Sequence, residues 1–173
     1  MRRYYGKYRG TVTNNIDPLN LGRIQAQVAG VSNVVPSTWA LPCLPFAGNL
    51  SGFFVLPAIQ SVVWIEFEGG DVRKPIWSGG CWGDGQIPAP PLIPPQALAA
   101  PPALQQLTIT TTAGNTVMVS DVPGPTGGIL LRTATGAFIS ISDTGIIISN
   151  GQGATIAMTG PAVTVNQGAM EVI

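Results

Sequence analysis

The last third of the chain, residues 107–173, repeats one short pattern of apolar residues followed by Thr, Asn and Gly. Aligned on the first apolar residue, the repeats begin at residues 107, 129, 146 and 163, which are 22, 17 and 17 residues apart. The longer first interval contains a Pro- and Gly-rich turn insertion at 123–127, so the underlying period is 17. A second strand-like piece follows in the repeats, at 116–121, 137–143 and 154–159. A short fixed period of this kind is typical of stacked β units.

A single repeat cannot bury its own apolar face. The region contains one aromatic residue, Phe138, and no helical periodicity, so a lone chain would have a thin core and long unpaired strand edges. Three identical chains around one axis would bury the apolar residues and pair the strand edges with neighbouring chains. The sequence therefore predicts a triple-stranded β-helix, or β-prism, formed by a homotrimer over residues 107–173. The residues predicted to face its axis are Ile109, Val117, Val119, Ile139, Ile141, Ile148, Ile156 and Val165.

The first half of the chain has a different composition. The whole sequence is 45% hydrophobic and 9% charged, with 22 Gly and 16 Pro, which favours an ordered, turn-rich β protein. Residues 1–85 hold seven of the eight Lys and Arg and eleven of the twelve aromatic residues, which predicts a separate N-terminal domain over residues 1–86. Residues 87–106 form the predicted linker; the seven prolines of 87–104 forbid a continuous membrane-spanning helix.

Short strands separated by turn signals are expected in the N-terminal domain, at 9–13, 22–28, 52–57, 61–68 and 75–79. About five strands in a domain of this length favour a closed barrel of the OB type. The predicted fold class is therefore all-β, an OB-fold barrel followed by the trimeric β-helix. The basic N-terminus has no apolar segment behind it, which predicts synthesis in the cytoplasm, with Cys43 and Cys81 as reduced, buried or half-buried thiols.

The first half of the chain carries a set of residues in a characteristic order: Gly10, Val12, Asp17, Pro18, Gly22, Arg23, Ile24, Trp39, Ala47, Gly48, Gly52, Pro57, Val63, Phe67, Gly70, Asp71, Pro75 and Gly79. This order resembles the OB domain of central spike proteins from contractile injection machines. The family includes the baseplate assembly protein V of contractile phage tails and the VgrG-like spikes of type VI secretion and related extracellular systems.

This resemblance implies a trimeric OB domain at the end of the tail tube, in contact with tube, hub and baseplate proteins, followed by a needle that punctures the target envelope. It implies assembly into a virion tail baseplate or an injection particle. The chain has no histidine, so the iron-binding apex of some phage spikes cannot form, and the short linker leaves no room for a lysozyme-like domain. A blunt end at Met170, Glu171, Val172 and Ile173 resembles the platform for a PAAR-like tip protein.

No catalytic or cofactor site is expected. Without histidine, a Ser or Cys nucleophile lacks its usual base. Glu66 and Glu68, two positions apart, could serve as an acid and base, but the polar face of an amphipathic strand explains them more simply. Asp121 and Asp143 occupy equivalent repeat positions, so a trimer could hold a cation between three carboxylates; both also lie in turn sequences, which we favour.

The N-terminal segment combines cations with aromatic residues, and its predicted role is an assembly contact made by Arg2, Arg3, Tyr4 and Tyr5. OB barrels also bind single-stranded nucleic acids through such surfaces, so this function is the first alternative. The excess of only two positive charges in the domain argues against it, and no nucleic-acid partner is expected. A trimeric fibre or adhesin is the second alternative, although the repeat region offers almost no aromatic or charged binding face.

Overall fold

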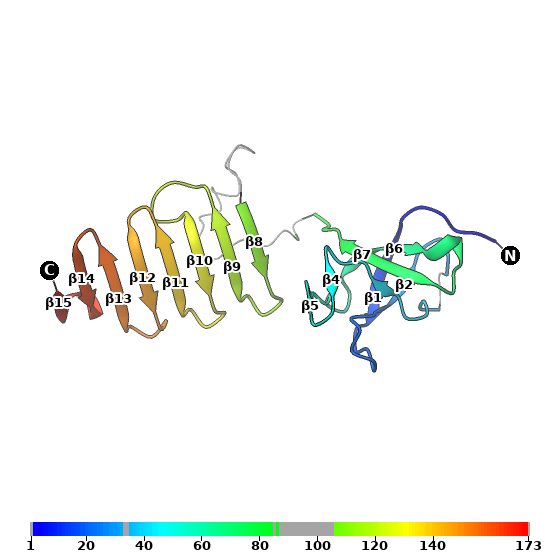
Figure 1. Ribbon diagram of the computed structural model, residues 1–173, viewed down its shortest axis with the longest axis horizontal. Coiled ribbons are helices and arrows are strands. Elements are labelled where there is room, and N and C mark those ends of the chain that lie inside the picture. The colour runs from blue at the N-terminus through cyan, green and yellow to red at the C-terminus, as the bar shows by residue number, and fades with distance from the viewer. Residues whose placement is uncertain (1, 33–34, 85, 87–105, 173) are drawn as a thin grey trace. The chain divides into compact units, whose positions relative to one another are not determined.

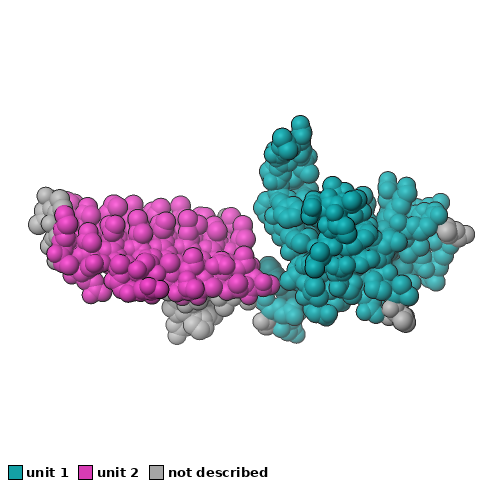
Figure 2. Space-filling view, turned by 90° about the horizontal axis from the view of Figure 1, so that it is seen from below, with its two compact units in different colours: residues 1–87 teal, residues 88–173 magenta. Residues whose placement is uncertain are grey.

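The computed structural model describes residues 2–32, 35–84, 86 and 106–172, in two compact units that divide between residues 87 and 88 (Figure 1, Figure 2). Strands make up both units, and the helical pieces of the described part are two short 3-10 turns, η1 (Glu68–Gly70) and η2 (Asn166–Gly168). The all-β class predicted from the sequence is confirmed. None of the helices in these residues is long and apolar enough to cross a membrane. The predicted linker lies outside the described residues, apart from Gln106.

The first unit is a five-stranded sheet in the order β2-β1-β6-β7-β3, antiparallel except where β3 runs parallel to β7. The strands are β1 (Tyr8–Asn14), β2 (Gln25–Val28), β3 (Leu41–Pro42), β6 (Val62–Phe67) and β7 (Pro75–Gly80). Ile24 and Ala40 precede the two outer strands and exchange backbone hydrogen bonds of 2.7 and 3.2 Å. This bridge joins the two ends of the sheet and closes it into a barrel.

Alternating side chains fill the barrel. Along β6, Val63, Ile65 and Phe67 point inward, as the alternation of apolar and polar residues in this strand predicts. The complete buried core consists of Val12, Ile24, Ala26, Val28, Ala40, Val63, Ile65, Phe67 and Trp77. Gly10 lies against this core, where a Cβ atom would come within 2.7 Å of Ile65 Cγ1 and 3.2 Å of Ala26 Cβ. Gly10 therefore leaves room for inward side chains of β2 and β6, the two strands that flank β1.

Gly10→Ala is expected to destabilise the first unit by about 1–3 kcal/mol, because the added methyl group overpacks a filled core. The four tryptophans, Trp39, Trp64, Trp77 and Trp82, all belong to this unit, so their fluorescence during urea unfolding of the full chain measures its stability. Gly83→Ala is the control, since the Cβ there would meet only the flexible side chain of Gln86. Equal unfolding midpoints for the two variants would contradict the close approach.

A buried ion pair organises the connection between β1 and β2. The carboxylate of Asp17 accepts hydrogen bonds from the backbone N–H groups of Leu19, Leu21 and Arg23 and from the Arg23 guanidinium, at 2.6–3.3 Å. The guanidinium also lies over the Trp39 ring, 5.3 Å from its centroid. The Arg23 side chain, together with the backbone donors, holds the pKa of Asp17 well below its ordinary value.

The stability of the first unit is expected to fall as the pH drops below about 4, the range in which an unfolded aspartate takes up a proton. Folding lowers the pKa of Asp17, so its contribution is complete above the unfolded pKa and is lost as the pH falls toward the folded one. The Arg73 side chain lowers the pKa of Asp71 in the same way. Asp17→Asn should unfold at lower urea at pH 7 and flatten this acid dependence, as measured by tryptophan fluorescence.

The exposed Asp84 supplies the control for this experiment. Asp84→Asn should keep both the neutral midpoint and the acid slope of the wild type. An unchanged acid slope in Asp17→Asn would show that the pair with Arg23 does not produce the pH dependence.

Two expectations for the first unit are wrong. The segment 52–57 does not form a barrel strand: β4 (Ala47–Gly48) and β5 (Ser51–Gly52) form a separate hairpin, and the residues after β5 are exposed through Leu56. The apolar run Phe53–Leu56 lacks the alternation of a barrel strand, and β3 already completes the barrel. Cys43 is exposed rather than buried or half-buried; Cys81 is half-buried, and both are free thiols.

The second unit is one sheet of eight strands in chain order, each antiparallel to the next (Figure 1). The strands are β8 (Gln106–Thr110), β9 (Thr116–Ser120), β10 (Gly128–Arg132), β11 (Phe138–Ser142), β12 (Gly145–Ser149), β13 (Thr155–Thr159), β14 (Ala162–Val165) and β15 (Met170–Val172). The predicted pairing of strand edges between chains is wrong for β9–β14, because each of these strands is paired on both edges within its own chain.

The sequence repeat is visible in the turns on one side of this sheet. Thr111, Thr133 and Asn150 each donate a backbone hydrogen bond to the carbonyl four residues later, at 2.9, 2.9 and 3.1 Å. These three turns are 22 and 17 residues apart, the same intervals as the repeat. Each repeat therefore corresponds to two strands of the sheet.

Candidate trimer interface

One face of the eight-stranded sheet carries two columns of apolar side chains. Strand register places one member of each column opposite the next, from strand to strand. The first column is Leu107, Val119, Ile129, Ile141, Ile146, Met158 and Val163. The second is Ile109, Val117, Leu131, Ile139, Ile148, Ile156, Val165 and Met170. We call these two columns the apolar face; they contain no polar residue.

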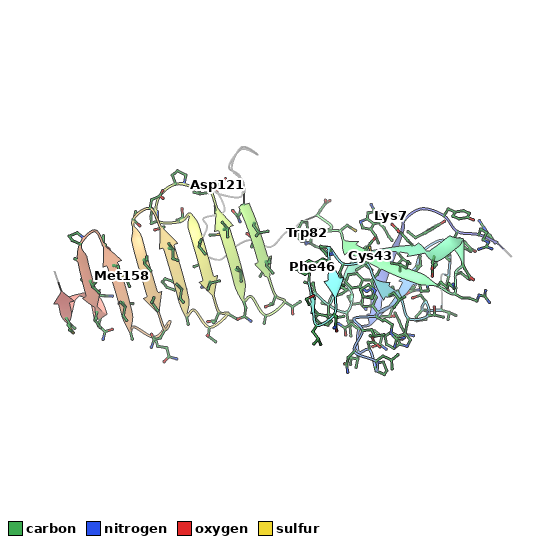
Figure 3. All side chains as sticks on the ribbon, in the orientation of Figure 1. Lys7, Cys43, Phe46, Trp82, Asp121 and Met158 are labelled. Atoms are coloured by element: carbon green, nitrogen blue, oxygen red, sulfur yellow. The ribbon has the colours of Figure 1, made fainter. Side chains whose placement is uncertain are left out.

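The apolar face is largely exposed in the single chain. Ten of its side chains, from Ile109 on β8 to Met158 on β13, are 39–46% exposed, and Ile146 is half-buried. Figure 3 labels Met158. A shallow hollow of about 440 Å³ lies along the second column, lined in part by Val117, Leu131 and Ile148. Contiguous apolar surface on this scale is uncommon on monomeric proteins and marks an interaction surface.

The opposite face of the sheet is more polar. Thr and Ser occupy about half of its positions, and Thr110 and Thr116 share a hydrogen bond of 3.3 Å between neighbouring strands. A small buried cluster of Met118 and Leu130, with Phe138 packed against it, interrupts this polar surface. The two faces therefore differ in chemistry, and the more continuous apolar surface is the one made by the two columns.

Both units match known protein-family models. Residues 8–82 match the type VI secretion system/phage-baseplate injector OB domain, and residues 106–171 match the phage baseplate V C-terminal trimerisation domain. Each unit is therefore similar to a domain found in phage baseplate V proteins. A search of curated proteins found no match.

These matches support a baseplate spike protein of the phage baseplate V kind, with an OB-fold domain at its N-terminus and a trimerisation domain at its C-terminus. Both families are structural components of baseplates, which assemble into a virion or an injection particle. The predicted OB-fold is thereby confirmed, and the second unit, which carries the apolar face, is the unit that matches the trimerisation domain.

All eight residues predicted to face the trimer axis lie on the apolar face of this baseplate V domain. Ile109, Val117, Ile139, Ile148, Ile156 and Val165 belong to the second column, and Val119 and Ile141 to the first. Their role at the axis stays a prediction. Residues that were not named from the sequence complete the face, and the alternation within each strand is the signal that identifies them: Leu107, Ile129, Leu131, Ile146, Met158 and Val163.

The predicted platform for a tip protein falls on the last strand. β15 pairs with β14 on one side, and its other edge has no partner strand among the described residues. Met170 is 60% exposed there. Glu171 and Val172 follow it in β15, and Ile173 lies outside the described residues.

The predicted assembly arm is partly folded against its own domain. Tyr4 packs on Tyr8 and Phe67, with ring centroids 6.2 and 6.0 Å away. The Arg3 guanidinium donates to the Gly69 carbonyl at 2.7 Å. Arg2, which is exposed, lies over the Tyr4 ring, and Tyr5 is 71% exposed, so these two residues offer most of the arm's free surface.

An apolar hairpin that the sequence analysis missed provides a second exposed surface on the OB domain. All residues from Pro45 to Leu56 are exposed, including Phe46, Leu50 and Phe54 at 60, 101 and 69%. Figure 3 labels Phe46. We call this segment, 45–56, the apolar hairpin. The sequence signal is the absence of charged residues between Arg23 and Glu66. Because this uncharged stretch also includes buried strands, it does not distinguish the hairpin from the core.

The carboxylates considered for catalysis or metal binding are engaged elsewhere or isolated. Lys7 pairs with Glu66, and Lys74 lies 3.8 Å from Glu68, which begins η1 rather than continuing β6. Asp143 accepts a hydrogen bond of 3.2 Å from the Gly124 backbone, which belongs to the connection between β9 and β10 and not to its own turn. Among the described residues, His, Cys, Asp and Glu form no group of three that could hold a metal ion.

Ile156→Asp is expected to prevent trimer formation, because three carboxylates would be buried together, at a cost of several kcal/mol per ion. Ile156 is 40% exposed in the single chain, so the change should affect association more than the folding of one sheet. Light scattering on the purified full chain measures the mass. Thr159→Asp, an exposed position on the same strand and the other face, is the matched control and should remain trimeric. A trimeric Ile156→Asp would exclude the apolar face as the interface.

Proposed function

We propose that this chain is the central spike of a contractile injection particle, built from three copies whose apolar faces pack around a common axis. The observation that carries the proposal is the pair of uninterrupted apolar columns on a unit that matches a trimerisation domain. Burying these columns removes apolar area from water in all three chains at once, which is the main favourable contribution to protein association. The function is structural, and no catalytic role is assigned to the chain.

In this spike, the second unit forms the needle, a triple-stranded β-helix in which each chain supplies one sheet. Eight strands stacked about 4.8 Å apart span roughly 34 Å between the first and last strand. Sheath contraction would drive this needle through the envelope of the target cell. The exposed edge of β15, with Met170, would seat a PAAR-like tip protein.

The OB domain is the proposed attachment to the tail tube, hub and baseplate proteins. Arg2 and Tyr5 of the N-terminal arm and the apolar hairpin supply exposed surface for these contacts. The hairpin is free of charge over its whole length, which suits a protein contact better than binding to a phosphate backbone. The finer identity of the machine, whether phage tail, type VI or extracellular system, is not assigned.

The nucleic-acid alternative requires free cations, and those of the OB domain have partners within the domain. Four form ion pairs: Lys7, Arg23, Arg73 and Lys74. Two lie over aromatic rings, Arg2 on Tyr4 and Arg9 on Trp64, and Arg3 binds the Gly69 carbonyl. An adhesin would need a binding face on the rod, and Phe138 is the one aromatic residue in the sequence after Trp82.

The spike is expected at the baseplate end of contractile particles from the producing cell, in three copies per particle. Immunogold labelling of purified particles locates it, and quantitative mass spectrometry counts it.

The purified trimer should bind single-stranded DNA weakly. Its Kd for a fluorescent dT30 oligonucleotide should be about 10 µM or higher at physiological salt. Two results together would favour the nucleic-acid function instead. The first is tight, salt-sensitive binding that disappears in the triple variant Arg2→Ala, Arg3→Ala, Tyr4→Ala, and the second is the absence of immunogold label on the particles.

A further inference from the structure

Arg132 is an unusual residue in the second unit. It is the only Lys or Arg after residue 74, and it ends β10 between Thr116 and Phe138 of the neighbouring strands. Its Nη1 atom is buried and, in the described part of the chain, is the buried side-chain nitrogen that lacks a hydrogen-bond partner. A buried charged donor without a partner is costly. The Arg132 side chain as a whole is only half-buried, so the rest of its guanidinium is open to a partner outside the single chain.

Besides Glu171 on β15, the acidic residues of the second unit are Asp121 and Asp143, which lie at the other ends of the strands. Arg132 and Phe138 are paired at one end of β10 and β11, whereas Asp143 follows Ser142 at the opposite end of β11. Asp121, labelled in Figure 3, follows Ser120 at that same end. A five-residue strand separates the two ends by roughly 16 Å, so Arg132 cannot reach either carboxylate of its own sheet.

A three-fold arrangement brings opposite ends of neighbouring sheets together. If three sheets enclose an axis that runs across their strands, the Arg132 end of each sheet meets the Asp143 end of the next. Rotation about the axis keeps every residue at its own height along the needle. The corner of the trimer therefore joins a surface with one cation to a surface with two carboxylates.

The position of the Asp143 carboxylate along the needle axis favours Asp143 over Asp121 as the partner of Arg132. Asp143 Oδ2 accepts the Gly124 N–H at 3.2 Å, and Gly124 lies midway along the connection between β9 and β10. The carboxylate is thereby turned back toward the level of β10, the strand that ends in Arg132. It makes no ion pair within the described chain, so it is available to a second copy.

We propose that Arg132 of each chain forms an ion pair with Asp143 of the next chain, so that three equivalent pairs close the corners of the trimer. This inference rests on the proposed packing of three apolar faces around an axis. The ion pair would fix the register between neighbouring chains. Apolar columns that are shifted by one strand along the axis still bury apolar residues, whereas Arg132 and Asp143 meet in one register only.

A double-mutant cycle on the full chain tests the pair. Arg132→Gln and Asp143→Asn should each speed trimer dissociation in guanidinium about tenfold or more, and the double variant should dissociate no faster than either single variant. Arg132→Lys keeps the charge and should stay nearer the wild type. Asp121→Asn, the other carboxylate at that end, is the matched control and should be additive with Arg132→Gln. Additive effects of Arg132→Gln and Asp143→Asn would overturn the proposal, as would coupling of Arg132 to Asp121.

A cross-link gives a readout independent of stability. With Cys43→Ser and Cys81→Ser as background, Arg132→Cys and Asp143→Cys in the same chain should give covalent trimers with a short bismaleimide on a denaturing gel. Arg132→Cys alone should give none. Light scattering of the wild type distinguishes failure of the trimer from failure of the ion pair. A monomer overturns both the proposed trimer and the pair. A trimer that shows neither coupling nor the cross-link overturns only the pair.

Discussion

The apolar face of β8–β15 is the constraint on which the second unit depends. An antiparallel sheet normally presents one face to a core and the other to water, and here the core side of the sheet has no second layer over its two columns. Backbone hydrogen bonding is already satisfied within the chain for β9–β14. What remains unsatisfied is apolar surface, so association with identical sheets is a matter of side-chain burial rather than of strand pairing.

The first unit solves the same problem without partners. The bridge between Ile24 and Ala40 closes its sheet, and the barrel interior then buries the inward residues of every long strand. Ion pairs such as Asp17 with Arg23 neutralise its charges locally. This unit is therefore complete as a folded domain, and its exposed apolar hairpin is surplus to its own stability. The OB domain is therefore self-sufficient, whereas the eight-stranded sheet depends on partners. This division is consistent with the similarity to baseplate V proteins.

The 17-residue period and the alternation within strands were sufficient to predict the repeat unit and the side of the sheet to which Ile139 and Ile141 belong. Register within one chain was not predictable, because alternating β-branched residues suit pairing with the same chain or with another equally well. The apolar hairpin was missed for a related reason: Phe53–Leu56 is apolar whether it is buried or exposed. The sequence showed Asp17 only as one residue of the family resemblance and did not predict its hydrogen bonds. The five groups that donate to its carboxylate are brought together by the folded loop between β1 and β2.

In-chain strand pairing also decides how the proposed needle would carry a load. Each sheet holds a ladder of backbone hydrogen bonds that runs along the axis from β8 to β15, so compression is resisted within every chain separately. The apolar contacts between chains then prevent the three sheets from buckling apart, and they act across the axis. Thr and Ser supply about half of the outward positions, and their hydroxyl groups cost far less to remove from water than charged groups would. A surface with few charged groups suits the proposed passage of the needle through a membrane.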